Sequence, residues 1–342
     1  MSGSQRIPSL DGLRAVSIAL VVAGHLWAPL TALAAFGVHI FFVISGFLIT
    51  SLLEHEYLTT GAINLRHFYW RRSFRIFPAA YAYIFIIAIL CPAARGSLGY
   101  AATYTASYHV GNIDSRYVHL WSLSIEEQFY LLWPLVIAFC FRRRAVIALA
   151  TIGACAGFRL WEALCHPFVR TALHYSPPGA MDSIAIGCLL AIYYPQVRKK
   201  LGWLAESGGM CLALAATAWI LHLVTWSGAA SAVYGCVPLL IALWIFVAVE
   251  RSSPILNGHV AIFIGTLSYS IYLWQEPFLG GVLLPPVMAL VCILGLAVVS
   301  YQFVERPALR ISSRWASGQA HRCILRTSPR SGSSKQLGSE AG

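Results

Sequence analysis

Long apolar runs recur along the whole chain, and short polar segments separate them. An α-helix needs about 20 apolar residues to cross the hydrocarbon core of a bilayer. The pattern therefore predicts an all-α protein, a polytopic membrane helix bundle of about ten transmembrane helices. The predicted spans are 12–30, 36–53, 77–94, 119–141, 145–161, 178–194, 209–226, 232–249, 259–278 and 282–304.

Composition agrees with this pattern. Hydrophobic residues make up 58% of the 342 residues and charged residues only 11%, whereas a soluble domain has about 25% charged residues. We expect one membrane domain over residues 1–310. The segment 311–342 is basic and rich in Ser and Gly, which predicts a disordered tail.

The formal net charge of +11 does not require a nucleic-acid partner. If the chain begins in the cytoplasm, most lysines and arginines fall in segments that face the cytoplasm, as the positive-inside rule demands. Only Arg95, Arg116, Arg159 and Arg170 would lie outside. Both termini are therefore expected in the cytoplasm.

The first apolar run shares features with a cleavable signal peptide: Arg6, the apolar residues 15–23 and the A-x-A pattern at 32–34. A second apolar run follows at once, and Asp11 and His25 do not suit a disposable leader. We therefore expect the first run to be retained as a transmembrane helix.

No pattern predicts metal or serine-hydrolase chemistry, because zinc-ligand spacings, Gly-rich phosphate loops and the G-x-S-x-G motif are all missing from the sequence. The nine cysteines are scattered without a C-x-x-C pair, which is typical of small buried apolar residues. Cys91 and Cys165 lie near predicted outer helix ends and could pair.

Three ionisable residues in the first helix need an explanation, because charges are costly in a membrane. Asp11, Arg14 and His25 fall within about 60° on one face of the helix. Arg14 and His25 lie about 16 Å apart along the axis, which would put Arg14 at the cytoplasmic interface and His25 near mid-membrane. The alternative is an interfacial pair between Asp11 and Arg14, with His25 bonded to a neighbouring helix.

The span 119–141 carries a polar and aromatic stripe made of His119, Ser122, Glu126, Tyr130 and Trp133. A buried carboxylate needs a partner, and a histidine or arginine of another helix would supply it. Glu126 could orient a histidine that acts as a general base, or it could form a structural ion pair. The spacing alone does not decide between these two roles.

Arginines also gather between the second and third spans, in "LRHFYWRRSFRIFP". Arg72 and Arg75 share a face if this segment is helical, and guanidinium groups suit phosphate capture. Positive-inside topology or binding of anionic lipid is the alternative reason for such a cluster.

Three further polar residues are weaker candidates. Asp182 could cap the sixth helix or lie near a cavity mouth. His39 is at least as well explained by packing as by catalysis. Glu276 precedes a proline at an outer helix end, where we expect solvent to reach it.

Seven blocks occur in the order expected of the acyltransferase-3 family of integral membrane O-acyltransferases, which the chain resembles from about Ser9 to Arg310. The blocks are "SLDGLRAVSIALVVAGH", "GVHIFFVISGFLIT", "RRSFRIFP", "HLWSLSIEEQFYLLWP", "MDSIAIGCLLA", "LSYSIYLWQEPF" and "FVERPALR". The chain departs from the family pattern at His39, where aspartate is frequent, and at Gln275, where histidine is common. No role is assigned to those two positions.

The resemblance implies transfer of an acyl group, commonly acetyl from acetyl-CoA, to a hydroxyl of a cell-surface or secreted glycan, in a bacterial cytoplasmic (inner) membrane. It implies no tightly bound cofactor, with acyl-CoA as the donor substrate. His25 matches the family's essential histidine, and Glu126 the glutamate of the S-L-x-x-E block. Further predicted site residues are Arg14, Arg71, Arg72 and Arg75 for the donor, and Asp11, Ser122, Glu127, Tyr130 and Asp182 in supporting positions.

These residues suggest a mechanism. His25 would take the proton from the acceptor hydroxyl, Glu126 would orient its ring, and the arginines would hold the CoA phosphates. A covalent acyl-histidine relay is an alternative route. A proton-coupled transporter or a lipid-linked sugar flippase is the alternative function, and a macrolide or another small glycoside the alternative acceptor.

Overall fold

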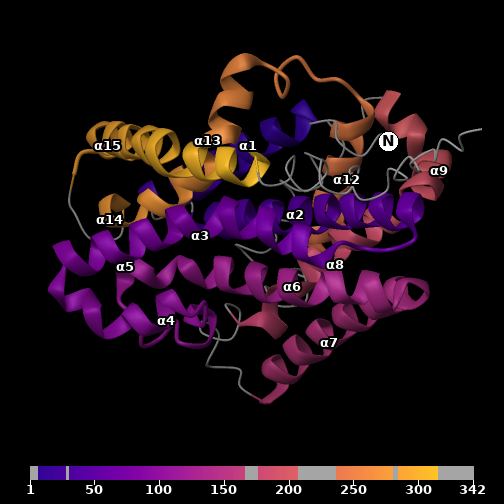
Figure 1. Ribbon diagram of the computed structural model, residues 1–342, viewed down its shortest axis with the longest axis horizontal. Coiled ribbons are helices and arrows are strands. Elements are labelled where there is room, and N and C mark those ends of the chain that lie inside the picture. The colour runs from indigo at the N-terminus through magenta and orange to yellow at the C-terminus, as the bar shows by residue number, and fades with distance from the viewer. Residues whose placement is uncertain (1–6, 28–30, 166–175, 207–235, 280–283, 315–342) are drawn as a thin grey trace, which may run out of the picture.

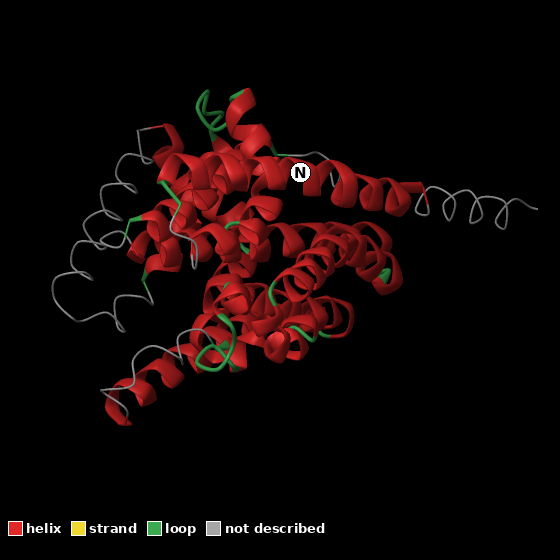
Figure 2. Cartoon of the chain, turned by 90° about the vertical axis from the view of Figure 1, so that its left-hand side faces the viewer, coloured by secondary structure: helices red, strands yellow, loops and turns green. Residues whose placement is uncertain are grey.

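The computed structural model describes residues 7–27, 31–165, 176–206, 236–279 and 284–314. Within these ranges the chain is helical and contains no strand, so the predicted all-α class is confirmed (Figure 2).

The longer helices are α1 (Pro8–Leu26), α2 (Thr31–Thr60), α3 (Leu65–Leu90), α6 (Leu120–Phe139), α7 (Arg144–Cys165), α8 (Pro177–Ile192), α9 (Tyr194–Glu206), α12 (Val237–Glu250), α13 (His259–Trp274) and α15 (Pro286–Ser300). Three short helices are α4 (Leu98–Ala102), α5 (Ser115–Val118) and α14 (Glu276–Leu279). A π-helical turn, Tyr301–Glu305, extends α15.

Several helix boundaries follow from local chemistry. Pro8 stands in the first turn of α1, where its missing N–H costs nothing. The side chain of Asn64 accepts a hydrogen bond from the backbone N–H of His67 and caps α3. Predicted and observed boundaries nevertheless differ: α1 was expected over 12–30 and lies at Pro8–Leu26, so His25 falls in its last turn rather than near its middle.

Five helical stretches among the described residues are long and apolar enough to cross a membrane, and a bent pair could supply a sixth. The five are Pro8–Leu26, Ala32–Thr60, Leu65–Leu90, Phe141–Glu162 and Pro286–Arg314. The pair is α8 with α9, which meet at an angle of 90°. The chain is thus a multi-pass membrane protein, although the structure supports fewer spans than the ten expected, and the predicted span 209–226 lies outside the described residues.

Figure 1 shows α2, α3 and α6 running along the long axis of the molecule, with α4 and α5 at one end and α9 at the other. The centre of the bundle is packed closely, and α2 lies against both α1 and α8. At Gly46 of α2, an added Cβ atom would stand 1.9 Å from the backbone oxygen of Ile184 in α8. Small residues let membrane helices approach this closely, so this glycine fixes the α2–α8 contact.

Helix α6 is too polar in its first half to count among the five spans, and its packing explains why that is tolerated. Ser122, Ser124 and Tyr130 are buried against other helices, while Leu131 and Leu132 are 60% and 58% exposed. The polar face therefore points into the bundle, and the apolar face points outward.

The helix that follows α15 continues to residue 314, so the first four residues of the expected tail are helical. The rest of that tail lies outside the described residues.

Candidate functional site

Five helices, α1, α2, α3, α6 and α13, enclose a cavity of about 110 Å³. Its polar lining includes Arg14, Arg72, Arg75 and Glu126, and we call it the arginine cavity after them. All four were predicted site residues from three separate segments, and Ser122, a fifth, also lines the cavity. The fold therefore brings together five of the predicted site residues from three separate segments of the chain.

The arginines are held by their neighbours. The guanidinium carbon of Arg72 lies 3.1 Å from the centre of the Tyr130 ring, and its Nε lies 3.8 Å from Oε1 of Glu127. Tyr130 and Glu127 were predicted in supporting positions, and the structure places both around Arg72. A charged group over an aromatic face is attracted by the ring quadrupole, which adds to the ion pair.

Arg14 donates a hydrogen bond of 3.1 Å from Nη1 to Oδ1 of Asp11, one turn earlier on α1. Arg75 interacts electrostatically with both Arg14 and Arg72, so three like charges face one another across the cavity. Each guanidinium has five N–H donors, and the contacts to carboxylates leave donors for a ligand. Arg71, by contrast, does not line the cavity.

Glu126 accepts hydrogen bonds from Ser45 of α2 and, at 2.8 Å, from the hydroxyl of Tyr130. The expected partnership between Glu126 and His25 does not appear among the described residues, and His25 does not line the cavity. Glu126 instead ties α6 to α2 beside the arginines.

His25 lies at the end of α1, with its side chain exposed. Its Nδ1 is 2.8 Å from the backbone oxygen of Val21 in the preceding turn. A carbonyl oxygen can only accept, so this contact requires the proton on Nδ1 and leaves Nε2 as the basic nitrogen of the neutral ring. Electrostatic neighbours of His25 are Glu276 and His119.

Glu276 is 5% exposed, so the expectation that solvent reaches it is wrong. It is the first residue of the short helix α14, which packs against α5, α13 and α15. Sequence reasoning had not connected this residue, or His119, with His25. We call His25, His119, Gln275 and Glu276 the His25 cluster.

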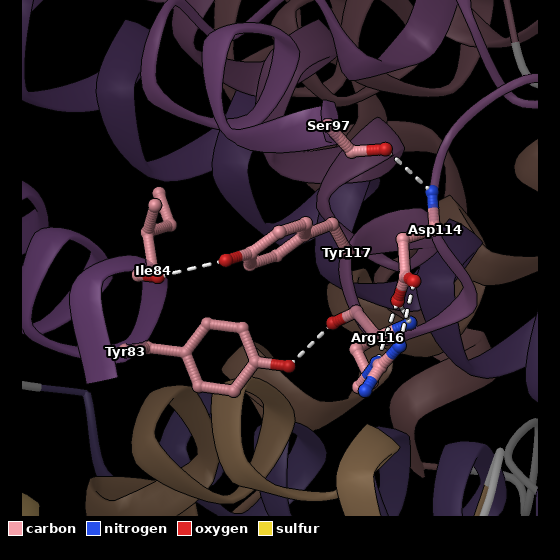
Figure 3. Close-up of polar contacts among 6 residues, drawn as sticks. All are labelled: Tyr83, Ile84, Ser97, Asp114, Arg116 and Tyr117. Carbon is pink, nitrogen blue, oxygen red and sulfur yellow. Dashed lines mark hydrogen bonds and ion pairs between the residues drawn. The ribbon is translucent and has the colours of Figure 1, made fainter. Parts of the chain in front are cut away.

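A short hydrogen-bonded segment anchors the chain ahead of His119 (Figure 3). The Tyr83 hydroxyl donates to the backbone oxygen of Arg116, and the Tyr117 hydroxyl donates to that of Ile84, over 2.5 and 2.8 Å. These two bonds join α5 to α3 and hold the start of α6 in place.

The same segment carries an ion pair at 2.7 Å between Arg116 and Asp114, whose backbone N–H also binds Ser97 (Figure 3). Hydrogen bonds from the Arg116 side chain are the main cause that lowers the pKa of the Asp114 carboxyl below its ordinary value.

Asp182 has a structural partner rather than a place in the cavity. Its Oδ2 lies 2.7 Å from Nη2 of Arg159, and both side chains are buried between α7 and α8. Helix α8 begins at Pro177, five residues earlier, so the expected capping role is wrong.

Three cavity residues were missed by sequence reasoning, although each stands in a block quoted above: Ser45, Tyr269 and Tyr272. Glu305, an electrostatic neighbour of Arg75 in the last quoted block, was missed as well. Glu305 accepts a hydrogen bond from Ser270 within the π-helical turn, a feature often found at functional sites. Their positions in the family blocks were the available signal.

Two other features lie apart from these groups. A more open depression of about 600 Å³ lies between α9 and α12, but it contains none of the predicted site residues, and its Arg198 is paired with Glu250 at 3.0 Å. No group of three or more His, Cys, Asp or Glu in the described part of the chain could hold a metal ion.

A family model described as an acyltransferase domain, Acyl_transf_3, matches residues 7–301. O-acetyltransferase OatA of Staphylococcus aureus is 29% identical, over 90% of this chain and 58% of that protein. The putative peptidoglycan O-acetyltransferase YrhL of Bacillus subtilis is 29% identical, over 88% of this chain and 54% of the relative.

Peptidoglycan O-acetyltransferase OatA of Listeria monocytogenes is 28% identical, over 88% of this chain and 55% of the relative. The chain thus spans little more than half the length of these relatives. No solved structure matches.

Proposed function

The chain belongs to the acyltransferase-3 family, and on that premise we propose that it is a membrane O-acetyltransferase that acetylates hydroxyls of a cell-surface glycan, with peptidoglycan as the first acceptor to test. The relatives named as peptidoglycan O-acetyltransferases align with 88% of the chain. The observation that carries the chemistry is the Nδ1–Val21 contact, which leaves Nε2 of His25 available as a base.

In the proposed reaction, Nε2 of His25 takes the proton of the acceptor hydroxyl as that oxygen attacks the thioester carbonyl carbon. The tetrahedral intermediate then collapses, the C–S bond breaks, and His25 returns its proton to the departing sulfur. Histidine suits both steps because its ordinary pKa lies near neutrality. In a relay, Nε2 would attack the thioester itself and pass the acetyl group on.

Acetyl-CoA is the proposed donor. A cavity of about 110 Å³ is far smaller than a whole-ligand pocket of roughly 300–1,000 Å³. The arginine cavity would therefore take only a slender part of the donor, with Arg72 and Arg75 on the phosphates and Arg14 deeper inside. Arg71 is exposed on the same helix and would add charge at the mouth. The extended pantetheine arm would cover the roughly 16 Å between Arg14 and His25.

The proposed orientation places the arginine cavity toward the cytoplasm, with both termini on that side, because most cations then obey the positive-inside rule. The donor and an outer-surface glycan would approach from opposite sides. A ten-helix topology adds α6, α12 and α13 to the six candidate spans, together with the predicted span 209–226.

The comparisons give no support to a proton-coupled transporter or a lipid-linked sugar flippase, since the relatives named above are O-acetyltransferases. They likewise give no support to a macrolide acceptor. We therefore do not propose transport or a macrolide acceptor, and the experiment below includes a macrolide only for comparison.

The test uses the full chain, purified in detergent, with acetyl-CoA radiolabelled in the acetyl group. Soluble peptidoglycan fragments and a macrolide are offered as acceptors in parallel. We expect label on the glycan together with stoichiometric release of CoA. Label on the macrolide alone would overturn the glycan assignment, and failure to bind or consume acetyl-CoA would overturn the proposed donor.

A further inference from the structure

Helices α1 and α13 begin side by side. The Ser9 hydroxyl donates a hydrogen bond of 2.9 Å to Oδ1 of Asn257, just before α13. Nearly two turns into α13 (His259–Trp274), Gly265 lies against the backbone of Asp11, where an added Cβ atom would stand 1.9 Å from the Asp11 oxygen. The two helices therefore share a starting level and a close contact.

Their far ends bring two ionisable residues to the same end of the bundle. His25 follows Ser9 by 16 residues and Glu276 follows Asn257 by 19 residues, which corresponds to about 24 and 28 Å of helix. The difference between these two lengths is small enough for the side chains of His25 and Glu276 to bridge it. His25 also acts electrostatically on the Glu276 carboxyl.

The Glu276 carboxylate lacks other compensation. Its Oε2 is buried and has no hydrogen-bond partner among the described residues, and both side-chain amide atoms of fully buried Gln275 are likewise unpartnered there. A buried carboxylate is costly without a counter-charge or hydrogen-bond donors. A nearby cation must therefore compensate the charge of Glu276.

The other titratable groups in this region are already engaged, which leaves few candidates for the counter-charge of Glu276. The Tyr83 hydroxyl is used on the backbone oxygen of Arg116, and the Tyr272 hydroxyl on that of His119. Arg116, an electrostatic neighbour of Tyr83, makes two hydrogen bonds from its guanidinium to Asp114. His25 remains.

His119, which neighbours His25, is buried. Its ring lies near the Leu273 backbone and among the rings of Tyr83 and Tyr272, and neither ring nitrogen forms a hydrogen bond within the described structure. Because burial disfavours a charged imidazole, the exposed ring of His25 is better suited to carry the proton.

We propose that Glu276 is the positioning residue for His25: its carboxylate stabilises the imidazolium that forms when Nε2 takes the proton of the acceptor hydroxyl. The inference rests on the proposed function of His25. It replaces Glu126, which is engaged by Ser45 and Tyr130, as the carboxylate that serves the base. The proton stays on His25 until the sulfur leaves, and Glu276 remains ionised throughout.

The first arm of the test does not depend on enzyme activity. Diethyl pyrocarbonate acylates neutral imidazole and not imidazolium, and mass spectrometry of the full chain in detergent follows each histidine. If the carboxylate stabilises the protonated ring, Glu276→Gln should raise the modification rate of His25 at neutral pH about threefold or more. Glu126→Gln should leave that rate unchanged, and exposed His259 serves as the internal reference in every sample.

An unchanged rate at His25 in Glu276→Gln would overturn the proposal, as would an equal increase in Glu126→Gln. The glutamine is isosteric with glutamate, so it removes charge rather than volume, and a melting curve of each variant confirms that it is folded.

The second arm measures acetyl transfer from acetyl-CoA to peptidoglycan fragments. Glu276→Gln should lower kcat about 10- to 100-fold while KM for acetyl-CoA stays within about twofold, and Glu276→Asp should restore part of kcat. A normal kcat would show that the pair plays no part in the reaction. If the wild type transfers nothing, the proposed function fails, while the first arm still decides the His25–Glu276 pairing.

Discussion

The arginine cavity and the His25 cluster are built in opposite ways, although helix α1 contributes to both. In the cavity, Arg14 is paired with Asp11, Arg72 lies over Tyr130, and Glu126 accepts two hydrogen bonds. In the His25 cluster, the buried polar atoms of His119, Gln275 and Glu276 lack such partners in the described structure.

The difference suggests a division of labour. A network whose members hold one another keeps its shape before a ligand arrives, which suits binding of a phosphate-bearing donor. A buried carboxylate that relies on one histidine for its counter-charge responds when that histidine gains or loses a proton, which suits proton transfer. Binding and chemistry would then fail separately on mutation.

The largest expected effect is on chemistry. His25→Ala should lower acetyl transfer about 10²- to 10⁴-fold, because it removes the proposed general base, while acetyl-CoA binding persists. Radiolabel transfer and equilibrium binding on the same preparation check both halves. His259→Ala, at an exposed position at the start of α13, is the matched control. Normal turnover in His25→Ala would make the residue structural and remove the contrast between the two regions.

A smaller effect, on donor binding rather than on acetyl transfer, is expected from a substitution in the arginine cavity. Arg72→Ala should weaken acetyl-CoA binding about 10- to 100-fold through loss of charge-assisted hydrogen bonds to phosphate. The modification rate of His25 should not change. Arg66→Ala removes an exposed arginine from the same helix and should bind normally. Equal losses in both variants would point to general surface charge rather than to the cavity.

Glu126→Gln should act on stability. The hydrogen bonds from Ser45 and Tyr130 would then reach a neutral acceptor, which lowers the free energy of unfolding by about 1 kcal/mol. Thermal melting in detergent measures the change, and Glu206→Gln, at the exposed end of α9, provides a glutamate control. If transfer collapsed while the melting temperature held, Glu126 would belong with the chemistry.

The smallest effect concerns the segment that anchors the start of α6. The lowered pKa of Asp114 means that the folded state favours its ionised form, so the stabilisation is present above about pH 4 and is lost as the pH falls through the lowered pKa. Melting temperature should therefore fall more between about pH 5 and pH 3 in the wild type than in Asp114→Asn. Parallel curves would indicate that the Arg116 pair contributes nothing to stability.

Sequence reasoning reached the cavity more readily than the cluster. Arg14, Arg72, Arg75 and Glu126 lie in blocks quoted for the family resemblance, and the stripe on α6 identified the face that Glu126 shares with Ser122. Glu276 was noted only as a weaker, solvated candidate, because a glutamate before proline at a helix end is ordinarily solvated. Its helix, α14, packs against α5, α13 and α15, and no local sequence pattern encodes those contacts.

The sequence also failed to predict the boundaries of individual helices and the interhelical partners of buried charges. The expected position of His25 near mid-membrane assumed a helix over 12–30, whereas α1 begins at Pro8 and ends at Leu26. Asp182 looked like a cap or a site residue, and its partner Arg159 belongs to another helix.

The sequence by itself determined that the protein is helical and crosses the membrane, because apolar runs of this length have few other stable solutions in water or lipid. It also determined the family, through seven blocks in order. Only the tertiary structure decided which carboxylate meets which base. Helical periodicity places a side chain on a face, but its partner depends on which helices lie together and in what register, and here the close α1–α13 contact at Gly265 brings His25 and Glu276 to one end of the bundle.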